Sequence, residues 1–184
     1  MSRALLIVDI QNDYFPGGRM ELLNPEAAAS NANQIAAAFR AKGLPVIYMQ
    51  HISLQEGAEF FLPDTDGIEI HSSVKPEESD TVFVKHYPNS FRETELADYL
   101  KANNINHLTI TGMMTHICID TTTRAAVDGG LTVELVEDAC ATRDLTFDGK
   151  TTKAEQVHTA YLAAINYAFC PVLSTEEFLK NFQQ

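Results

Sequence analysis

The segment HLTITGMMTHICIDTTTRAAVDGGLTVELVED, residues 107–138, contains a complete strand–helix–strand unit. Its first part, residues 107–114, is rich in large and β-branched apolar side chains, which favours a strand. Residues 118–130 form a helix-period segment that ends on two glycines, a common helix stop. A second apolar strand follows at residues 131–138. Strands that alternate with helices in this way predict a parallel sheet with helices on its faces.

The rest of the chain repeats this alternation. Further strands are predicted at residues 4–10, 45–52, 81–87 and 170–175, and further helices at 25–43, 90–104, 153–169 and 175–182. The helix at 90–104 should begin at Ser90, since Ser90 and Glu93 form a capping-box pattern. No internal repeat, linker or low-complexity tract is present in the sequence. We therefore expect a single domain over residues 1–184, with a three-layer doubly wound α/β fold around a mainly parallel sheet.

The connection between the second and third strands, residues 53–80, is much longer than the usual link of about 2–6 residues. It contains the apolar run Phe60-Phe61-Leu62, which is too apolar for a freely solvated loop. Long excursions of this kind are commonly lids or partner-binding segments. We expect the run to cover a pocket or a neighbouring subunit, which favours a homo-oligomer.

Composition and charge exclude several classes of protein. The formal net charge of −12 disfavours nucleic-acid partners and anionic membrane surfaces, and no Lys/Arg cluster offsets it. No apolar run approaches the ~18 residues of a membrane helix, and the N-terminal run lacks a signal-peptide cleavage site. Three cysteines without metal-type spacing indicate reduced thiols. We expect a cytoplasmic protein that acts on a small molecule.

Three polar residues follow or end predicted strands: Asp9 the first, Lys85 the third and Cys118 the fourth. Ligands of open α/β sheets bind at the carboxyl ends of the strands. Taken singly, Asp9 suits a turn cap, Lys85 a solvent-reaching chain and Cys118 a small core residue. Together at one sheet edge, Asp9 and Lys85 would satisfy each other beside the thiol.

These three residue types support one coherent chemistry. A helix start and a nearby ammonium stabilise a thiolate, which predicts a lowered pKa for Cys118. Asp9 could accept the thiol proton and later give it to a leaving amine. Backbone N–H groups at the helix start could hold an oxyanion. The pattern favours a cysteine amidohydrolase that uses neither metal nor histidine.

Three blocks of the chain together carry a family resemblance. LLIVDIQNDYFPGG (5–18), VFVKHYPNSF (82–91) and TGMMTHICIDTTTRAAVDGGLTVELVEDACAT (111–142) resemble the signature blocks of the isochorismatase-like cysteine hydrolases. That superfamily includes nicotinamidases, N-carbamoylsarcosine amidohydrolase and isochorismatases. The resemblance runs from Ala4 to about Phe178, in the order of the family.

The resemblance implies a role for each matching residue. Asp9 corresponds to the catalytic aspartate of the family, Lys85 to its lysine and Cys118 to its nucleophile. The oxyanion hole would be the backbone N–H groups of Met114 and Cys118. A cis peptide bond would join Met113 to Met114.

The resemblance also bears on metals and substrates. Nicotinamidases carry an Asp-x-His metal motif on the second strand, where this chain has His51 followed by Ser53. We therefore expect no metal or other cofactor, and nicotinamide is disfavoured as the substrate.

Some isochorismatases lack the cysteine and cleave a vinyl ether, so Cys118 favours C–N hydrolysis. Vinyl-ether hydrolysis and a catalytically silent binding module remain alternatives. A magnesium-dependent phosphoryl-transfer domain ranks last, because it leaves Cys118 without a role.

The substrate pocket is expected to contain aromatic and histidine side chains near the strand ends. The candidates are Phe15, His51, Phe61, Phe91, His116 and Ile117.

Overall fold

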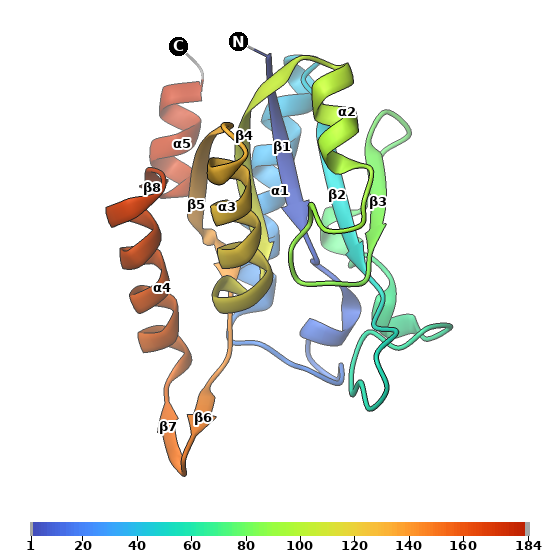
Figure 1. Ribbon diagram of the computed structural model, residues 1–184, viewed down its shortest axis with the longest axis vertical. Helices are drawn as coiled ribbons and strands as arrows, with labels where there is room; N and C mark the ends of the chain where they lie inside the picture. Colours follow the sequence, from blue (N-terminus) through green and yellow to red (C-terminus); the bar gives the residue numbers. More distant parts are fainter. Residues whose placement is uncertain (1, 183–184) are drawn as a thin grey trace.

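A computed structural model describes residues 2–182 and contains a central six-stranded sheet (Figure 1). The spatial order is β3-β2-β1-β4-β5-β8, and each neighbouring pair is parallel. The strands are β1 Ser2–Val8, β2 Val46–His51, β3 Thr81–Lys85, β4 Ile105–Met113, β5 Thr132–Ala141 and β8 Val172–Leu173. This confirms the expected parallel α/β architecture.

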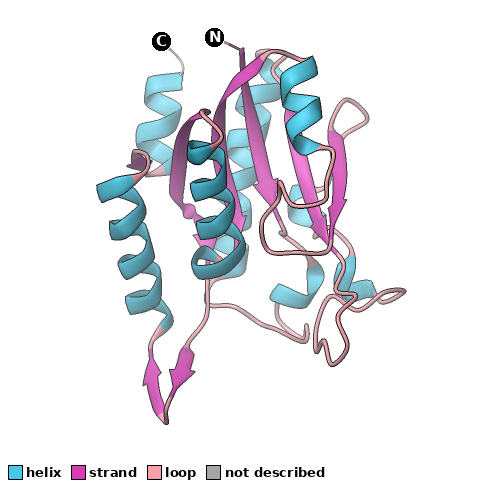
Figure 2. Ribbon diagram, viewed as in Figure 1, coloured by secondary structure: helices cyan, strands magenta, loops and turns pink. Residues whose placement is uncertain are grey.

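Helices cover both faces of the sheet, which gives the three expected layers (Figures 1 and 2). One face packs against α1 and α5, and the other against α2, α3 and α4. The helices are α1 Pro25–Ala41, α2 Leu96–Ala102, α3 Asp120–Asp128, α4 Ala154–Ala168 and α5 Thr175–Phe182. Strand β1 is a continuous apolar run because its side chains alternate between two cores. Leu5 and Ile7 belong to the α1/α5 core, and Leu6 and Val8 to the other.

A glycine allows β1 and β4 to approach closely near their carboxyl ends. Gly112 pairs with Val8 and has φ +128°, in the region that favours glycine. A Cβ atom on Gly112 would lie 2.0 Å from the Val8 carbonyl oxygen. Asp9 follows Val8 directly and Cys118 follows β4, so this contact brings their two segments together.

The helix expected from Ser90 begins later, at Leu96. Ser90 is fully buried, its N–H donates to Thr122 Oγ1 (3.1 Å), and its own hydroxyl accepts from Thr122 (2.9 Å). The predicted capping box is therefore wrong, because the Ser90 side chain ties the loop to α3.

The α-helix after β4 does not begin at Cys118. A π-type turn, Thr115–Ile119, comes first, and α3 begins at Asp120. The Ile119 N–H donates to the Met114 carbonyl five residues earlier (3.2 Å), which is the π pattern. Such turns are often found at functional sites.

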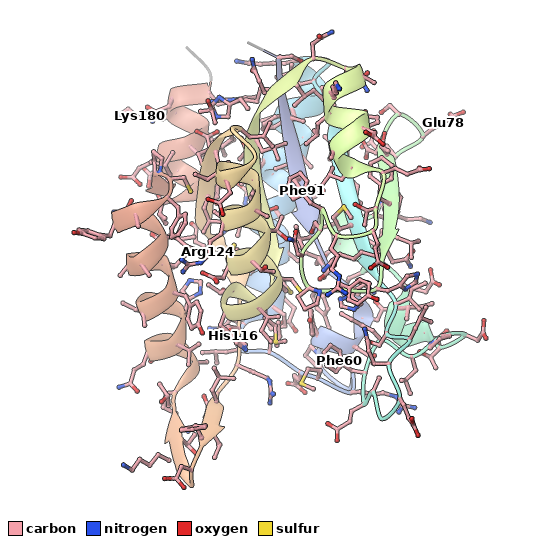
Figure 3. All side chains as sticks on the ribbon, in the orientation of Figure 1. Phe60, Glu78, Phe91, His116, Arg124 and Lys180 are labelled. Carbon is pink, nitrogen blue, oxygen red and sulfur yellow. The ribbon has the colours of Figure 1, made fainter. Side chains whose placement is uncertain are left out.

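The long connection at residues 53–80 is the crossover between β2 and β3. Because these strands are parallel, the chain must return along the sheet before β3 begins. Phe60 and Glu78, on this connection, lie far apart in Figure 3. Two 3-10 turns form within it, Asp66–Ile68 and Ser72–Val74, and the second packs against α1. Much of the connection is therefore structural.

A small hairpin was not predicted from the sequence. Its strands, β6 Leu145–Phe147 and β7 Lys150–Thr152, project from the body beyond α4 (Figures 1 and 2). Asp148 and Gly149 both have positive φ (49° and 71°), which suits a two-residue hairpin turn. The Asp-Gly pair was the available sequence signal.

None of the helices within residues 2–182 has the length and hydropathy needed to cross a membrane.

Candidate active site

Asp9 lies immediately beyond β1, at the carboxyl edge of the sheet. Its backbone has φ 53°, a left-handed conformation that non-glycine residues adopt at a cost. The Asp9 N–H donates to the Met49 carbonyl (3.0 Å), and the residue has no exposed surface. The backbone thus turns sharply where β1 ends, and the carboxylate is held inside the protein.

Lys85, the last residue of β3, is equally buried and faces Asp9. Its Nζ lies 2.8 Å from Asp9 Oδ2. The ammonium also donates to the carbonyl oxygens of Tyr87 (3.1 Å) and Pro88 (2.9 Å). Three acceptors therefore surround a group with three N–H bonds, which fixes the lysine in place.

The two charges stabilise each other against burial. Burial by itself would raise the pKa of Asp9, but the charge of Lys85 and the interactions with His51 together outweigh burial, and the pKa is lowered. Burial likewise opposes the charge of Lys85, yet Asp9 raises its pKa. Asp9 is therefore a carboxylate and Lys85 an ammonium at neutral pH.

Cys118 lies within the π-type turn, next to this pair. Its side chain is buried, and its Sγ, a carboxylate oxygen of Asp9 and a ring nitrogen of His51 all lie within 4.8 Å of one another. Burial and the negative charge of Asp9 raise the pKa of Cys118, and Lys85 only partly opposes them. The predicted lowering of this pKa is therefore wrong, because it neglected burial and the carboxylate.

The resting thiol is consequently neutral and lies beside a base. Asp9 Oδ1 is buried and has no hydrogen-bond partner within residues 2–182. A proton from Cys118 would satisfy this oxygen. In this arrangement Asp9 can take the proton of Cys118 and form the thiolate when a substrate is bound.

His51 ends β2 and lies beside the Asp9–Lys85 pair. Its Nδ1 is 3.5 Å from Lys85 Nζ and 3.8 Å from Asp9 Oδ2. Gln11 holds its backbone on both sides, since Gln11 Nε2 donates to His51 O (2.8 Å) and Gln11 Oε1 accepts from His51 N–H (2.7 Å). Sequence reasoning missed Gln11, although a polar side chain two residues after Asp9 was a usable signal.

Asp9, His51 and Cys118 also offer one potential metal-ligand atom each. A cation there would lie beside the Lys85 ammonium, which already neutralises Asp9. Ser53, which is buried, supplies only a hydroxyl near this group. These groups are therefore better suited to surround the protonated Lys85 than to bind a resident metal ion.

A cavity of about 400 Å³ opens above Cys118. The start of the crossover, residues 55–60, forms one wall, and Pro88 after β3 contributes to another. The remaining lining residues are Tyr14, His51, Ser53, Met114, Ile117 and Cys118. A cavity of this size suits a small organic molecule.

The structure places the six predicted pocket residues differently. His51 and Ile117 line the cavity, but the other four do not. Phe61 is fully buried behind it, with its ring 5.7 Å from that of His51. Burial within this chain explains Phe61, so no second subunit is needed to cover it.

The other three lie away from the catalytic cavity. Phe15 stacks on His71, with ring centroids 3.5 Å apart. His116 shares a hydrogen bond with Thr142 Oγ1. Phe91 lines a separate cavity beside α2 and α3, well apart from Phe60 in Figure 3. Residue type and closeness to a strand end did not reveal which way these rings point.

Tyr14 lines the cavity but is not among the six pocket residues predicted from the sequence. It is almost fully buried, yet its hydroxyl makes no hydrogen bond to another described residue. Burial and the charges of Cys118 and Asp9 raise its pKa well above the ordinary value. Tyr14 is therefore a neutral phenol beside the thiol, with a free O–H donor.

Comparisons with known proteins agree with this fold. A family model described as the isochorismatase domain matches residues 3–177, and the chain belongs to the isochorismatase family. The uncharacterized family protein YddQ of Bacillus subtilis is 51% identical over 98% of this chain and 100% of its own length.

Two solved structures extend the comparison. The crystal structure of a putative isochorismatase hydrolase from Oleispira antarctica has a TM-score of 0.93 and 45% identity, over 97% of this chain and 96% of that one. An N-carbamoylsarcosine amidase from Thermoplasma acidophilum has a TM-score of 0.79 and 26% identity, over 96% and 98% of the two chains. One of the structures similar to this chain is thus named as an amidase.

Proposed function

We propose that this isochorismatase-family hydrolase cleaves a C–N bond, in an amide or ureido group of a small molecule, through a covalent intermediate on Cys118. The observation that carries the proposal is a neutral thiol beside a carboxylate with one unpartnered oxygen, Asp9 Oδ1. Lys85 keeps that carboxylate ionised in spite of burial. The named amidase relative supports the same class of reaction.

The first half of the reaction forms a thioester. Asp9 Oδ1 accepts the thiol proton as Cys118 Sγ bonds to the carbonyl carbon. The oxyanion that develops is held by the backbone N–H groups of Met114 and Cys118, at the start of the turn, where N–H groups lack helical acceptors. When the C–N bond breaks, Asp9 gives its proton to the departing nitrogen.

The second half returns the enzyme to its initial state. Asp9 takes a proton from water, and the resulting hydroxide attacks the thioester carbon. The C–S bond breaks, the acid product leaves and the Cys118 sulfur regains a proton from Asp9. Lys85 stays charged throughout and keeps the pKa of Asp9 low enough for it to act as a base.

The test is to trap the intermediate. Small amides, ureido acids and lactams are screened for release of ammonia or amine, and the best substrate is quenched with acid during turnover. We expect intact-protein mass spectrometry to show one added acyl group, and peptide mapping to place it on Cys118. Cys140→Ala, which removes another buried thiol, should behave like wild type. Release of ammonia or amine that persists in Cys118→Ala would reject the covalent mechanism on Cys118.

A further inference from the structure

The catalytic cavity has no positive group that is free to bind a substrate. Within the described residues, its lining contains neither Lys nor Arg. Lys85 lies just beneath, but its ammonium is fully buried and already bonded to Asp9, Tyr87 O and Pro88 O. A substrate carboxylate would have to displace one of these acceptors in order to reach it.

The rim of the same cavity is acidic. Glu56 and Glu59 are both exposed and line the wall formed by the crossover. Asp9 and Lys85 cancel and Cys118 is neutral, so Glu56 and Glu59 are the carboxylates that give the lining of the cavity its negative charge. Carboxylates at the mouth of a concave site raise the local concentration of cations and repel anions, within about 8 Å at physiological salt.

Arg143 is the cation to weigh against this acidic rim. Burial first, and then the positive charge of Arg143, lower the pKa of His116. Arg143 nevertheless lines a different cavity, together with Glu21 and Asp144. Asp144 is itself paired with Lys153 (2.7 Å). The charge of Arg143 partly opposes the rise in the pKa of Tyr14, but Arg143 contributes no wall to the catalytic cavity.

Resting on the proposed C–N hydrolysis, we propose that the substrate of this enzyme is a cationic amide or ureido compound. Its ammonium or guanidinium group lies at the rim near Glu56 and Glu59, while its carbonyl carbon reaches Cys118. Anionic amides, including ureido acids with a free carboxylate, are poor substrates because the cavity repels them. Neutral amides of the same shape fall between the two.

Three amides of similar size test this charge preference. They are trimethylammonio-propanamide, its neutral tert-butyl isostere and the carboxylate succinamate. We expect kcat/KM to fall in that order, by roughly tenfold or more between cation and anion at low salt, and the ratio to shrink as salt rises. Faster hydrolysis of the anion would overturn the inference.

Substitutions at the rim test whether Glu56 and Glu59 cause the preference for cationic amides. Glu56→Gln with Glu59→Gln should reduce the cation-to-anion ratio several-fold. Glu78→Gln is the matched control, because it removes an acid from the far end of the same crossover (Figure 3) and should leave the ratio unchanged. An unchanged ratio in the double variant would contradict the assignment to Glu56 and Glu59.

A second readout does not depend on hydrolysis. Cys118 is labelled with the trimethylammonium-ethyl and the sulfonato-ethyl methanethiosulfonates, and its modification is followed by peptide mass spectrometry. We expect the cationic reagent to react faster, and the Glu56→Gln/Glu59→Gln variant to lose most of the difference. Charge selectivity in labelling without any amide turnover would reject the proposed hydrolysis and keep the cationic site. Equal labelling rates would reject the cationic site itself.

Discussion

At the scale of single residues, the charged side chains of the site, Asp9 and Lys85, are distinct from its thiol, Cys118. Asp9 and Lys85 are both fully buried and remain charged because each is the counter-ion of the other. Breaking such a pair leaves an uncompensated buried charge, which is strongly destabilising. Cys118, by contrast, is neutral at rest, and in the proposed mechanism it becomes reactive when Asp9 takes its proton.

Cys118→Ala tests the nucleophile. We expect kcat to fall by about 1,000-fold or more, because no other group can form the thioester. The change removes one small side-chain atom, so the thermal midpoint should move by only a few degrees. Kinetics on a confirmed amide and thermal unfolding check both statements. Near-normal turnover would exclude Cys118 as the nucleophile.

Lys85→Met tests the lysine. Without its counter-ion, Asp9 is dominated by burial, so its pKa rises and it becomes protonated near neutral pH. The alkylation of Cys118 should then shift to higher pH, with turnover greatly reduced, as pH-dependent labelling would show. Lys101→Met, on the surface of α2, is the control.

The same variant should reverse how stability depends on pH. In wild type the pKa of Asp9 is lowered by folding, so its contribution is present above the unfolded value, about 4, and is lost as pH falls. In Lys85→Met the folded pKa is raised, so stability should instead fall as pH rises through it. Denaturant unfolding across pH measures this, and parallel curves for the two proteins would mean that Lys85 does not control Asp9.

Metal removal tests the donor set around Cys118. Since Lys85 already neutralises Asp9, and the cysteine reaction supplies its own nucleophile, we expect prolonged EDTA dialysis to leave activity unchanged. Elemental analysis of the active enzyme accompanies the assay. Loss of turnover that zinc or iron restores would assign a metal to Asp9, His51 and Cys118.

At the scale of elements, the site depends on how closely two strands approach. Gly112 lets β4 lie against the backbone of Val8, and the chain turns into the site one residue later, at Asp9. The π-type turn after β4 then places Cys118 opposite that carboxylate. Strand spacing thus controls the distance between Asp9 and Cys118.

Gly112→Ala should therefore damage both stability and activity. The added Cβ would meet Val8 O at 2.0 Å, and backbone atoms must move to relieve the contact. We expect a loss of about 3–5 kcal/mol in the free energy of unfolding, the range of severe overpacking and backbone strain. Gly43→Ala is a matched control, since Gly43 also has positive φ (63°), but a Cβ added there would have no neighbouring atom within 4 Å. Equal losses in the two variants would show that the strand contact is not what matters.

At the scale of the whole molecule, two large aromatic residues stand free on the surface. Phe147 in the β6–β7 hairpin is 86% exposed, and Tyr167 on α4 is 92% exposed. An isolated two-stranded hairpin is marginal in water unless something packs on it. These residues, rather than the Phe60–Leu62 run, now support the proposed homo-oligomer.

The oligomeric state is directly measurable. We expect light scattering at micromolar concentration to give at least a dimer, and Phe147→Asp to shift the mass toward the 20.4 kDa monomer. Phe60→Asp, in the cavity wall, should impair catalysis without changing the mass. A monomeric mass for the wild-type protein would contradict the proposed homo-oligomer.

The sequence alone determined the order of the six sheet strands and the five α-helices within residues 2–182, and the edge at which Asp9, Lys85 and Cys118 meet, but not the β6–β7 hairpin. It could do so because local periodicity specifies each element, and because parallel strands bring their carboxyl ends together. The tertiary structure alone decided which way side chains point and how deeply they are buried. Phe15, Phe91 and His116 face elsewhere, Tyr14 enters the cavity, and burial beside Asp9 raises the pKa of Cys118 instead of lowering it. These properties arise from contacts between segments distant in sequence, which no local pattern encodes.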